Sequence, residues 1–260
     1  MFSLEANIIR QTPCGAGFYL LELEAPDVSS RAAPGQFVMV RVGDDYDPLL
    51  RRPLSVHDAG DGRIRLLYRV VGKGTGRLSR RGEGERVGLL GPLGNGFEVR
   101  PPLDTAALVA GGRGVAPMLF LARRIRRECP SARLILFFGA RTGEELVRLE
   151  AFENLNVEMR LATEDGSKGT KGLVTQLVRG SLLSDAEVRI YACGPMPMLK
   201  ALGPVAAEQS IPAQVSLEAH MSCGLGVCRG CVVKTKNGYA HVCQDGPVFP
   251  LDAPDWEVRT

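Results

Sequence analysis

The chain has 260 residues, a formal net charge of +3 at pH 7 and an apolar fraction of 45%. This length exceeds the usual size of one domain and predicts two domains with a small appendage. The weak net charge argues against nucleic acid as a partner. The one basic cluster, residues 123–127, is typical of the solvated face of a helix.

The cellular setting is predicted from what the sequence lacks. The first residues mix charged and apolar side chains and do not resemble a signal peptide. No apolar run approaches the ~18 residues of a membrane span. Of the seven cysteines, four lie within residues 223–243, which indicates a metal site more than a disulfide framework. We therefore expect a cytoplasmic protein that does not bind a membrane.

The first hundred residues contain short alternating runs broken by turn residues, at 18–23, 36–42 and 63–70. Such runs predict a small antiparallel β-barrel or sandwich over residues 1–100. Within it, the strand 67–70 leads into a glycine turn that ends in Thr75. Backbone N–H groups in such a turn could hold a pyrophosphate, although a plain hairpin would give the same pattern.

After the Pro101-Pro102 pair the pattern changes to continuous apolar runs, at 105–110, 134–138, 157–162 and 188–192. Helical patterns lie between them, for example at 118–129 and 172–179. Buried strands that alternate with helices predict a doubly wound α/β domain with a parallel sheet over residues 101–212. A last strand at 214–218 leads into the cysteine-rich segment.

Two turns of this α/β domain are candidates for binding a nucleotide. The first follows the strand 105–110 and contains Gly111, Gly112, Gly114 and, at the helix start, Pro117. It is not the G-x-G-x-x-G fingerprint. The second, Cys193-Gly194-Pro195, follows the fourth strand, at the carboxyl end of the sheet where ligands bind. Cys193 taken alone could equally be a buried apolar residue, but its place at this end of the sheet favours a contact with the nicotinamide.

The cysteine-rich segment has the spacing C-x4-C-x2-C-x11-C. Its candidate ligands are Cys223, Cys228, Cys231 and Cys243. The two spacings that separate the first three cysteines are those of plant-type [2Fe–2S] ligation. The glycines between them, Gly224, Gly226 and Gly230, allow tight curvature and close approach to sulfur. Structural zinc is the alternative, but zinc usually uses two separated C-x2-C pairs and only one is present.

Taken in order, the motifs R-P-L-S, Y-R-V-x-G-x-G-T, G-G-x-G-x-x-P and C-G-P and the cysteine spacing resemble the ferredoxin–NADP reductase superfamily. More closely, the chain resembles the electron-transfer subunits of two-component, NAD-dependent dihydroorotate dehydrogenases. The resemblance covers essentially the whole chain. Its most specific stretches are LLRRPLSV, LLGPLGNGF, SLEAHMSCGLGVCRGCVV and HVCQDGPVF.

The resemblance implies where the cofactors bind. FAD would bind residues 1–100, NAD(H) residues 101–212, and a [2Fe–2S] cluster residues 213–260. The implied flavin residues are Arg52 at the pyrophosphate, Pro53, Leu54, Ser55 near flavin N5, Leu67, Tyr68, Arg69, and Gly74 and Thr75 at the phosphates. Two residues depart from the superfamily pattern. Leu54 replaces a frequent tyrosine, so that stacking on the flavin is lost or supplied by Tyr68, and Arg113 replaces a small or apolar residue.

The resemblance also implies a function and a partner. Electrons would pass between NAD(H), FAD and the cluster, to or from an FMN-containing catalytic subunit that oxidises dihydroorotate in pyrimidine (UMP) synthesis. We expect a heterotetramer with two copies of each chain, and no catalytic residue for the substrate in this one. NADH is expected over NADPH, because Glu164 and Asp165 follow the third strand of the α/β domain. Arg141, after the second strand, argues the other way.

Two alternatives stay open. One is the flavin and iron–sulfur subunit of a sulfide dehydrogenase or an electron-bifurcating transhydrogenase. The other is a binding protein without turnover that carries zinc on the same fold.

Overall fold

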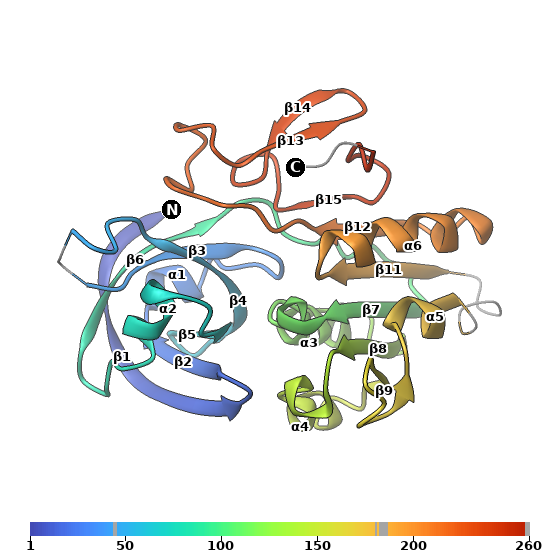
Figure 1. Cartoon of the computed structure of the whole chain (residues 1–260), viewed down its shortest axis with the longest axis horizontal. Helices are drawn as coiled ribbons and strands as arrows, with labels where there is room; N and C mark the ends of the chain where they lie inside the picture. Colours follow the sequence, from blue (N-terminus) through green and yellow to red (C-terminus); the bar gives the residue numbers. More distant parts are fainter. Residues whose placement is uncertain (44–45, 180, 182–186, 258–260) are drawn as a thin grey trace.

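The computed structural model describes residues 1–43, 46–179, 181 and 187–257. Figure 1 shows three parts of the molecule. A barrel made by the N-terminal strands lies on the left, a sheet with helices lies on the right, and the red C-terminal segment lies across the top of both.

Six strands close the N-terminal barrel in the order β1-β2-β5-β4-β3-β6, and each neighbouring pair is antiparallel. The strands are β1 (Phe2–Gly15), β2 (Phe18–Glu24), β3 (Phe37–Arg41), β4 (Arg52–Gly60), β5 (Arg63–Arg69) and β6 (Arg86–Leu93). In β5, Ile64 and Leu66 are fully buried while Arg63 and Arg65 are more exposed, because successive side chains of a strand point to opposite faces. The predicted antiparallel barrel is confirmed.

Two short helices accompany the barrel. They are α1 (Pro26–Ser29) and α2 (Lys73–Leu78). The first begins at Pro26, whose fixed φ suits the first position of a helix. The second begins directly after β5, within the glycine turn that the sequence marked as a phosphate cradle. That turn is therefore the start of a short helix and not a plain hairpin.

The second part contains a seven-stranded sheet in the order β10-β9-β8-β7-β11-β12-β15. Its strands are β7 (Thr105–Gly111), β8 (Arg133–Ala140), β9 (Glu158–Thr163), β10 (Thr170–Lys171), β11 (Val188–Cys193), β12 (Ala213–Ser216) and β15 (Val248–Pro250). All neighbours are parallel except β12 and β15. Every residue of β7 is buried, as expected of a central strand covered on both faces.

Helices cover both faces of this sheet. They are η1 (Gly112–Val115), α3 (Met118–Glu128), η2 (Gly143–Glu145), α4 (Leu149–Glu153), α5 (Val174–Arg179) and α6 (Met196–Glu208). The core of one face contains residues of α3 and α4, and that of the other contains residues of α5 and α6. The predicted doubly wound α/β arrangement is confirmed.

The cysteine-rich segment is inserted between two strands of that sheet. β12 and β15 lie at its edge, and between them β13 (Val232–Thr235) and β14 (Gly238–His241) form a separate two-stranded sheet. The chain thus leaves the α/β sheet after β12 and returns to it in β15. The domain boundaries at residues 100 and 212 stay predictions.

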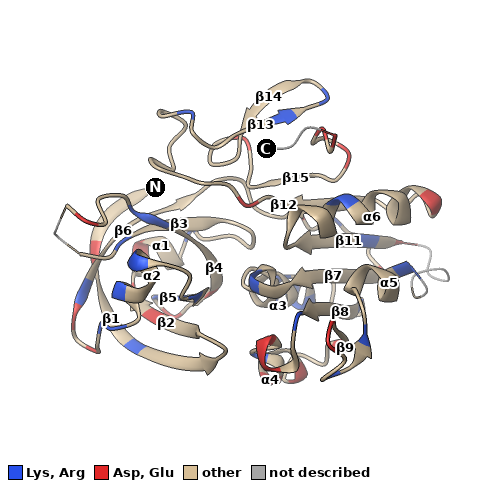
Figure 2. Ribbon diagram, viewed as in Figure 1, with Lys and Arg blue, Asp and Glu red and all other residues tan. Residues whose placement is uncertain are grey.

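Charged residues are spread along the chain, as the colours of the ribbon in Figure 2 show. The basic cluster at 123–127 lies on α3, where Arg124 pairs with Glu128 at 2.8 Å and Arg123 pairs with Asp58 of the barrel at 2.9 Å. Within the described residues, no helix is both long and apolar enough to cross a bilayer.

Candidate functional site

On the flavin side, the structure brings Arg52 and Gly74 together. Arg52 begins β4, and Gly74 lies in the first turn of α2. A Cβ atom at Gly74 would lie 2.2 Å from Arg52 Nε, so only glycine lets the guanidinium lie against this turn. The two residues that the sequence assigned to the pyrophosphate are therefore neighbours.

Thr75 closes the same turn with its side chain. Its hydroxyl oxygen accepts hydrogen bonds from the backbone N–H groups of Val71, at 2.9 Å, and Gly72, at 3.3 Å. The side chain is buried. These bonds hold the start of α2 in place and occupy the hydroxyl within the turn. A direct contact between Thr75 and a phosphate stays a prediction.

The residues Leu67, Tyr68 and Arg69 alternate between two surroundings. Leu67 packs in the hydrophobic core shared with the α/β part, whereas Tyr68 packs in the barrel core. The Tyr68 ring stacks on Tyr19 with 5.8 Å between centroids, its hydroxyl donates to Gln11, and burial raises its pKa. Both the ring and the hydroxyl of Tyr68 thus have partners inside the barrel. Its stacking on flavin stays a prediction. Pro53, Leu54 and Ser55 are half-buried on β4.

On the nucleotide side, the two predicted turns lie against each other. β7 and β11 are parallel neighbours, and Cys193 pairs with Ala110 just before the glycine turn. A Cβ atom at Gly114 would lie 1.9 Å from the backbone oxygen of Cys193, and one at Gly194 would lie 3.0 Å from the backbone nitrogen of Gly111. The turn that begins with Gly111 and Gly112 and the turn 193–195 therefore form one surface at the carboxyl end of the sheet, with Pro117 capping α3 behind it.

Cys193 is 4% exposed. Burial, followed by the charge of Glu218, raises the pKa of its thiol to about 12, although a hydrogen bond with Ser216 lowers it. The thiol therefore stays protonated at neutral pH, and it offers a small neutral surface. Arg113, the unusual residue of the glycine turn, donates to Glu218 at 3.1 Å. This exposed pair links the turn to the segment that enters the cysteine region.

Three contacts between polar groups join the barrel to the α/β part, and of the residues that make them sequence reasoning had assigned only Arg69 to a cofactor site. Arg69 pairs with Glu145 at 2.9 Å, and Arg141 pairs with the same carboxylate at 3.0 Å. Burial alone would raise the pKa of Glu145, but hydrogen bonds from Arg141 and Arg69 hold it below its usual value. In the other two contacts, His57 Nδ1 lies 2.6 Å from the Ala116 backbone oxygen, and Asp58 pairs with Arg123 at 2.9 Å. For His57 and Asp58, two polar residues directly after the R-P-L-S-V stretch were the available signal.

The cysteine loop surrounds its sulfur atoms with backbone N–H groups. Those of Leu225 and Cys228 donate to Cys223 Sγ at 3.3 and 3.4 Å, that of Gly226 donates to Cys243 Sγ at 3.1 Å, and that of Cys243 donates to Cys231 Sγ at 3.4 Å. Burial alone would raise the pKa of Cys223, but N–H groups, those of Cys228 and Leu225 foremost, lower it to about 6. Donors aimed at sulfur stabilise thiolates and tune a cluster's reduction potential.

Two of the three predicted glycines are required by this loop. Gly224 and Gly226 have φ of +73° and +79°, and a Cβ atom would lie 2.7 Å from Met39 Cγ and 2.0 Å from Gln244 Oε1, respectively. The expectation for Gly230 was wrong, because its φ is not in the left-handed region. A Cβ atom there would lie 3.7 Å from Cys228 Sγ, which is an ordinary contact.

The four cysteines lie in one loop, but as two neighbouring pairs. The thiol of Cys223 lies near that of Cys228, and the thiol of Cys243 lies near that of Cys231. In the part of the chain that the structure describes, no three Cys, His, Asp or Glu residues form a ready-made set of metal ligands. The soft sulfur donors and the converging N–H groups nevertheless fit an iron–sulfur cluster.

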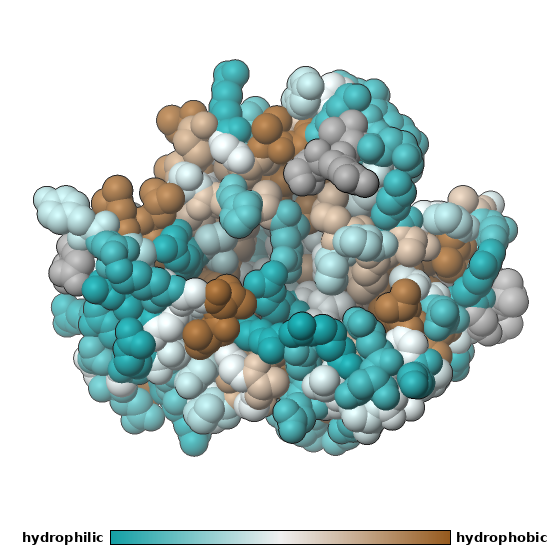
Figure 3. Space-filling model, viewed as in Figure 1, coloured by the Kyte–Doolittle hydropathy of each residue, from teal (hydrophilic) through white to brown (hydrophobic). Residues whose placement is uncertain are grey.

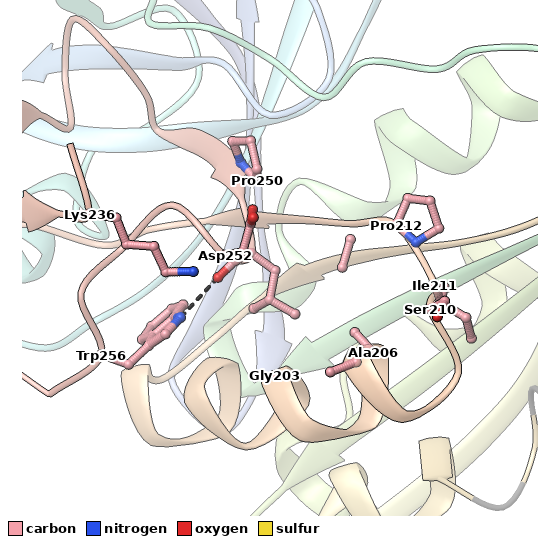
Figure 4. A pocket seen from close by; sticks show the side chains of 12 residues that line it. Gly203, Ala206, Ser210, Ile211, Pro212, Lys236, Pro250, Asp252 and Trp256 are labelled. Carbon is pink, nitrogen blue, oxygen red and sulfur yellow. Dashed lines mark hydrogen bonds between the residues drawn. The ribbon is translucent and has the colours of Figure 1, made fainter.

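A cavity of about 650 Å³ lies elsewhere, between α6 and the last residues described (Figure 4). Small side chains of α6, including Ala206, form its floor, and Lys236, Asp252 and Trp256 surround it. The Trp256 indole N–H donates to the Leu251 carbonyl at 2.9 Å. None of the predicted cofactor residues lines this cavity, and we assign it no part in the redox chemistry.

Three features together define the class of this protein. They are a barrel with an arginine at a glycine turn, a parallel sheet with a glycine turn at its carboxyl end, and a cysteine loop beside both. The class is that of ferredoxin–NADP reductase-like electron-transfer flavoproteins, whose cofactors are FAD, NAD(H) and, with this third segment, a [2Fe–2S] cluster. Comparisons with known proteins agree. Residues 108–203 match the oxidoreductase NAD-binding domain, and residues 218–253 match the iron–sulfur cluster binding domain of dihydroorotate dehydrogenase B.

Curated relatives identify the family more narrowly. The dihydroorotate dehydrogenase B (NAD(+)) electron transfer subunit of Desulforamulus reducens is 40% identical, with 97% of this chain and 98% of the relative covered. The subunit of the same name from Lysinibacillus sphaericus is 42% identical, with 94% and 95% covered. Among solved structures, that of the NADH-dependent reduced ferredoxin–NADP oxidoreductase, a protein of flavin-based electron bifurcation, superposes with a TM-score of 0.87. It is 30% identical, with 97% of this chain and 90% of that chain covered. The chain belongs to the family of dihydroorotate dehydrogenase B electron transfer subunits.

Proposed function

We propose that this subunit passes electrons between NAD(H) and an FMN-containing catalytic subunit that oxidises dihydroorotate, by way of its FAD and its [2Fe–2S] cluster. One observation carries the proposal. The cysteine loop contacts β3, the strand that pairs with β4, and β4 carries the R-P-L-S motif. A Cβ atom at Gly224 would lie 2.7 Å from Met39 of β3, and Met39 pairs with Pro53 of β4. The loop thus packs on the strand beside the R-P-L-S motif, which favours short electron transfer from flavin to cluster.

At the flavin, this chain's own residues would bind and orient the cofactor. The Arg52 guanidinium at the start of α2 would offset the charge of a pyrophosphate, and Gly74 leaves room for that guanidinium. Pro53, Leu54 and Ser55 on β4, with Leu67 and Arg69 on β5, would line the isoalloxazine ring. When bound, FAD supplies the conversion between two-electron and one-electron transfer.

At the nucleotide, the glycines at 111, 112 and 114 would let the cofactor approach the backbone, and the turn 193–195 would meet the nicotinamide. The protonated Cys193 thiol offers van der Waals contact there and no charge. At the cluster, Cys223, Cys228, Cys231 and Cys243 would be the ligands, and backbone N–H groups of the loop would donate to their sulfur atoms. Residues 1–100, 101–212 and 213–260 would then correspond to the FAD, NAD and cluster domains.

The catalytic partner would cover the cysteine loop. Four exposed apolar side chains lie on that loop and on the two strands that follow it. We call them the apolar rim: Leu225, Val227, Val232 and Tyr239, exposed to 41%, 80%, 43% and 76%. Val232 and Tyr239 lie on one face of the β13–β14 pair, since Tyr239 is opposite Lys234 and Lys234 faces the same side as Val232. Figure 3 shows apolar patches among polar atoms on the upper part of the molecule, where this segment lies. We propose a heterotetramer with two copies of each chain, in the cytoplasm.

A coupled assay tests this proposal. The isolated chain should reduce artificial acceptors with NADH and show no activity on dihydroorotate, whereas the assembled pair should link dihydroorotate oxidation to NAD⁺ reduction. Replacing Cys231 should abolish the link and leave the partner's own turnover with dyes. Dihydroorotate oxidation by the isolated chain, or an assembled pair that never reduces NAD⁺, would refute the assignment.

The structural similarity to the NADH-dependent reduced ferredoxin–NADP oxidoreductase supports a second candidate, a subunit of an electron-bifurcating complex. The identity to that chain is 30%, against 40% to the Desulforamulus reducens relative. A chain that couples to ferredoxin and NADP, and not to dihydroorotate, would favour this second candidate.

A further inference from the structure

His57 joins β4, which we call the flavin strand because it carries the R-P-L-S motif, to the glycine turn 111–114, which we call the nucleotide turn. It lies in β4, two residues after Ser55, where a register shift interrupts the pairing of β4 with β5. Its side chain is fully buried, and its Nδ1 atom lies 2.6 Å from the backbone oxygen of Ala116. Ala116 follows the glycine turn directly and precedes Pro117 and α3.

The geometry fixes the tautomer of this imidazole. A carbonyl oxygen can only accept a hydrogen bond, so Nδ1 must carry the proton. Nε2 is then an unprotonated acceptor, and it has no hydrogen-bond partner among the described residues. Burial lowers the pKa of His57 to about 4, the Ala116 bond raises it, and Arg148, Arg123 and Arg65 lower it further. The ring therefore stays neutral at physiological pH, with Nδ1 as its only donor.

The next residue, Asp58, supports the same joint. Asp58 is 1% exposed. Its carboxylate forms salt bridges with Arg65 of β5 at 3.0 Å and with Arg123 of α3 at 2.9 Å. Two consecutive residues of β4 thus contact the α/β part, one at the turn and one along the helix that follows it. The same strand carries Arg52 and Ser55 at its other end. Any shift of this joint therefore changes the separation between the flavin strand and the nucleotide turn.

We propose that His57 is a positioning residue for hydride transfer, because its bond to Ala116 fixes the nucleotide turn relative to the flavin strand. The inference rests on the proposed function, in which both cofactors meet at this junction. The reaction moves a hydride, two electrons and one proton, from NADH to the oxidised flavin and releases NAD⁺. Its rate depends steeply on the distance between the two rings, and a misplacement of about 1 Å can slow such a step by about 10²-fold.

Two amide substitutions separate the two ring nitrogens. In His57→Asn the amide N–H occupies the place of Nδ1–H, whereas in His57→Gln it lies one bond further out, near the place of Nε2. With NADH in anaerobic stopped flow, we expect the limiting rate of flavin reduction to stay within about twofold of wild type in His57→Asn. In His57→Gln and His57→Leu it should fall by about 10-fold or more. Only protein with full flavin and cluster absorbance is compared.

A matched control is Ile8→Val, which trims the barrel core on β1, a strand that does not pair with β4, and should lower stability without changing the limiting rate. A second readout needs no turnover. The chain has three histidines, so the nitrogen NMR signals of His57 can be assigned with single variants. Wild-type protein should show protonated Nδ1 and unprotonated Nε2 at neutral pH.

The outcomes distinguish a failure of the positioning role of His57 from a failure of the proposed function. An Nε2–H tautomer, or wild-type limiting rates in both His57→Gln and His57→Leu, would overturn the positioning role while the proposed function stands. A rate restored by His57→Gln and not by His57→Asn would also overturn it. A wild-type flavin that NADH does not reduce would instead remove the proposed function.

Discussion

The junction between barrel and sheet and the cysteine loop meet different needs with opposite surfaces. At the junction, His57, Asp58 and Glu145 are buried, and each contacts a group across the boundary. At the loop, Val227 and Tyr239 are largely exposed apolar side chains. Buried polar contacts with defined geometry fix one arrangement, whereas exposed apolar surface is suited to a partner that arrives from outside. Hydride transfer within the chain needs the first, and electron transfer out of it needs the second.

The largest expected effect is at the loop. Cys228→Ala removes a predicted ligand that is exposed, so the cluster absorbance should disappear while the flavin bands remain. Transfer to the partner should stop, and flavin reduction by NADH should continue. Absorbance spectra and labile sulfide measure this. Cys14→Ala is the control, because Cys14 lies in the barrel outside the loop. A Cys228→Ala protein with full labile sulfide would show that the ligand set was wrong.

At the nucleotide turn, which the junction holds beside the barrel, Gly114→Ala should be a damaging substitution although it adds a single methyl group. The new Cβ would lie 1.9 Å from the backbone oxygen of Cys193, where backbone must shift to make room. We expect a loss of about 1–3 kcal/mol in unfolding free energy, typical of overpacking, and weaker NADH binding. Denaturant titration and NADH titration measure the two effects. Gly203→Ala is the matched control, since nothing lies within 4 Å of its added Cβ, and it should be neutral or stabilising.

The buried His57 should make stability depend on pH. Its pKa falls from 6.5 to about 4 on folding, so the unfolded chain binds the additional proton between these values. Its contribution is therefore complete above about 6.5 and is lost as the pH falls through about 4. Each pKa unit corresponds to ~1.4 kcal/mol. Between neutral pH and a pH of about 4, the unfolding free energy of wild type should therefore fall by about 3 kcal/mol more than that of His57→Asn. Equal pH profiles of unfolding in the two proteins would show that the imidazole is not held neutral.

The apolar rim should control affinity for the partner without affecting the junction. Val227→Glu places a charge where we expect apolar contact, and binding of the catalytic subunit should weaken by about 10-fold or more. Leu173→Glu is the control, because Leu173 is similarly exposed, at 57%, but lies at the start of α5 on the sheet. Calorimetric titration measures both, and flavin reduction by NADH should stay at the wild-type rate. Equal affinities would place the docking surface elsewhere.

The smallest effect concerns the choice of nucleotide. Arg141, which could pair with a 2′-phosphate, is instead held by Glu145 at 3.0 Å. Glu145→Gln should free this guanidinium and raise the ratio of kcat/KM for NADPH to that for NADH by a few-fold, about the strength of a partly exposed ion pair. Glu144→Gln, at the adjacent position, should leave the ratio unchanged. Glu145→Gln also removes the partner of Arg69. That effect is common to NADPH and NADH in the same variant, so it cancels in the ratio of their kcat/KM values.

The sequence by itself determined the elements and the chemistry of the ligands. Alternation in 63–70 and the continuous apolar run 105–110 report local periodicity, which does not depend on what the strand later contacts. The cysteine spacing and the glycines at 111–114 are equally local, because one loop or turn supplies them. Arg52 and Gly74 could be assigned to one site only through the resemblance, and the structure then placed them in contact.

Tertiary structure decided how these parts face one another. The bond of His57 to Ala116, and the pairing of Glu145 with both Arg69 and Arg141, join residues far apart in the chain that carry no common motif. Tyr68 was assigned to the flavin site through the resemblance, and only the structure shows that its ring stacks on Tyr19 of β2. The pKa of about 4 for His57 likewise arises from burial between two parts of the chain. Burial and contact across a boundary depend on the whole fold, whereas periodicity and ligand spacing are properties of short segments.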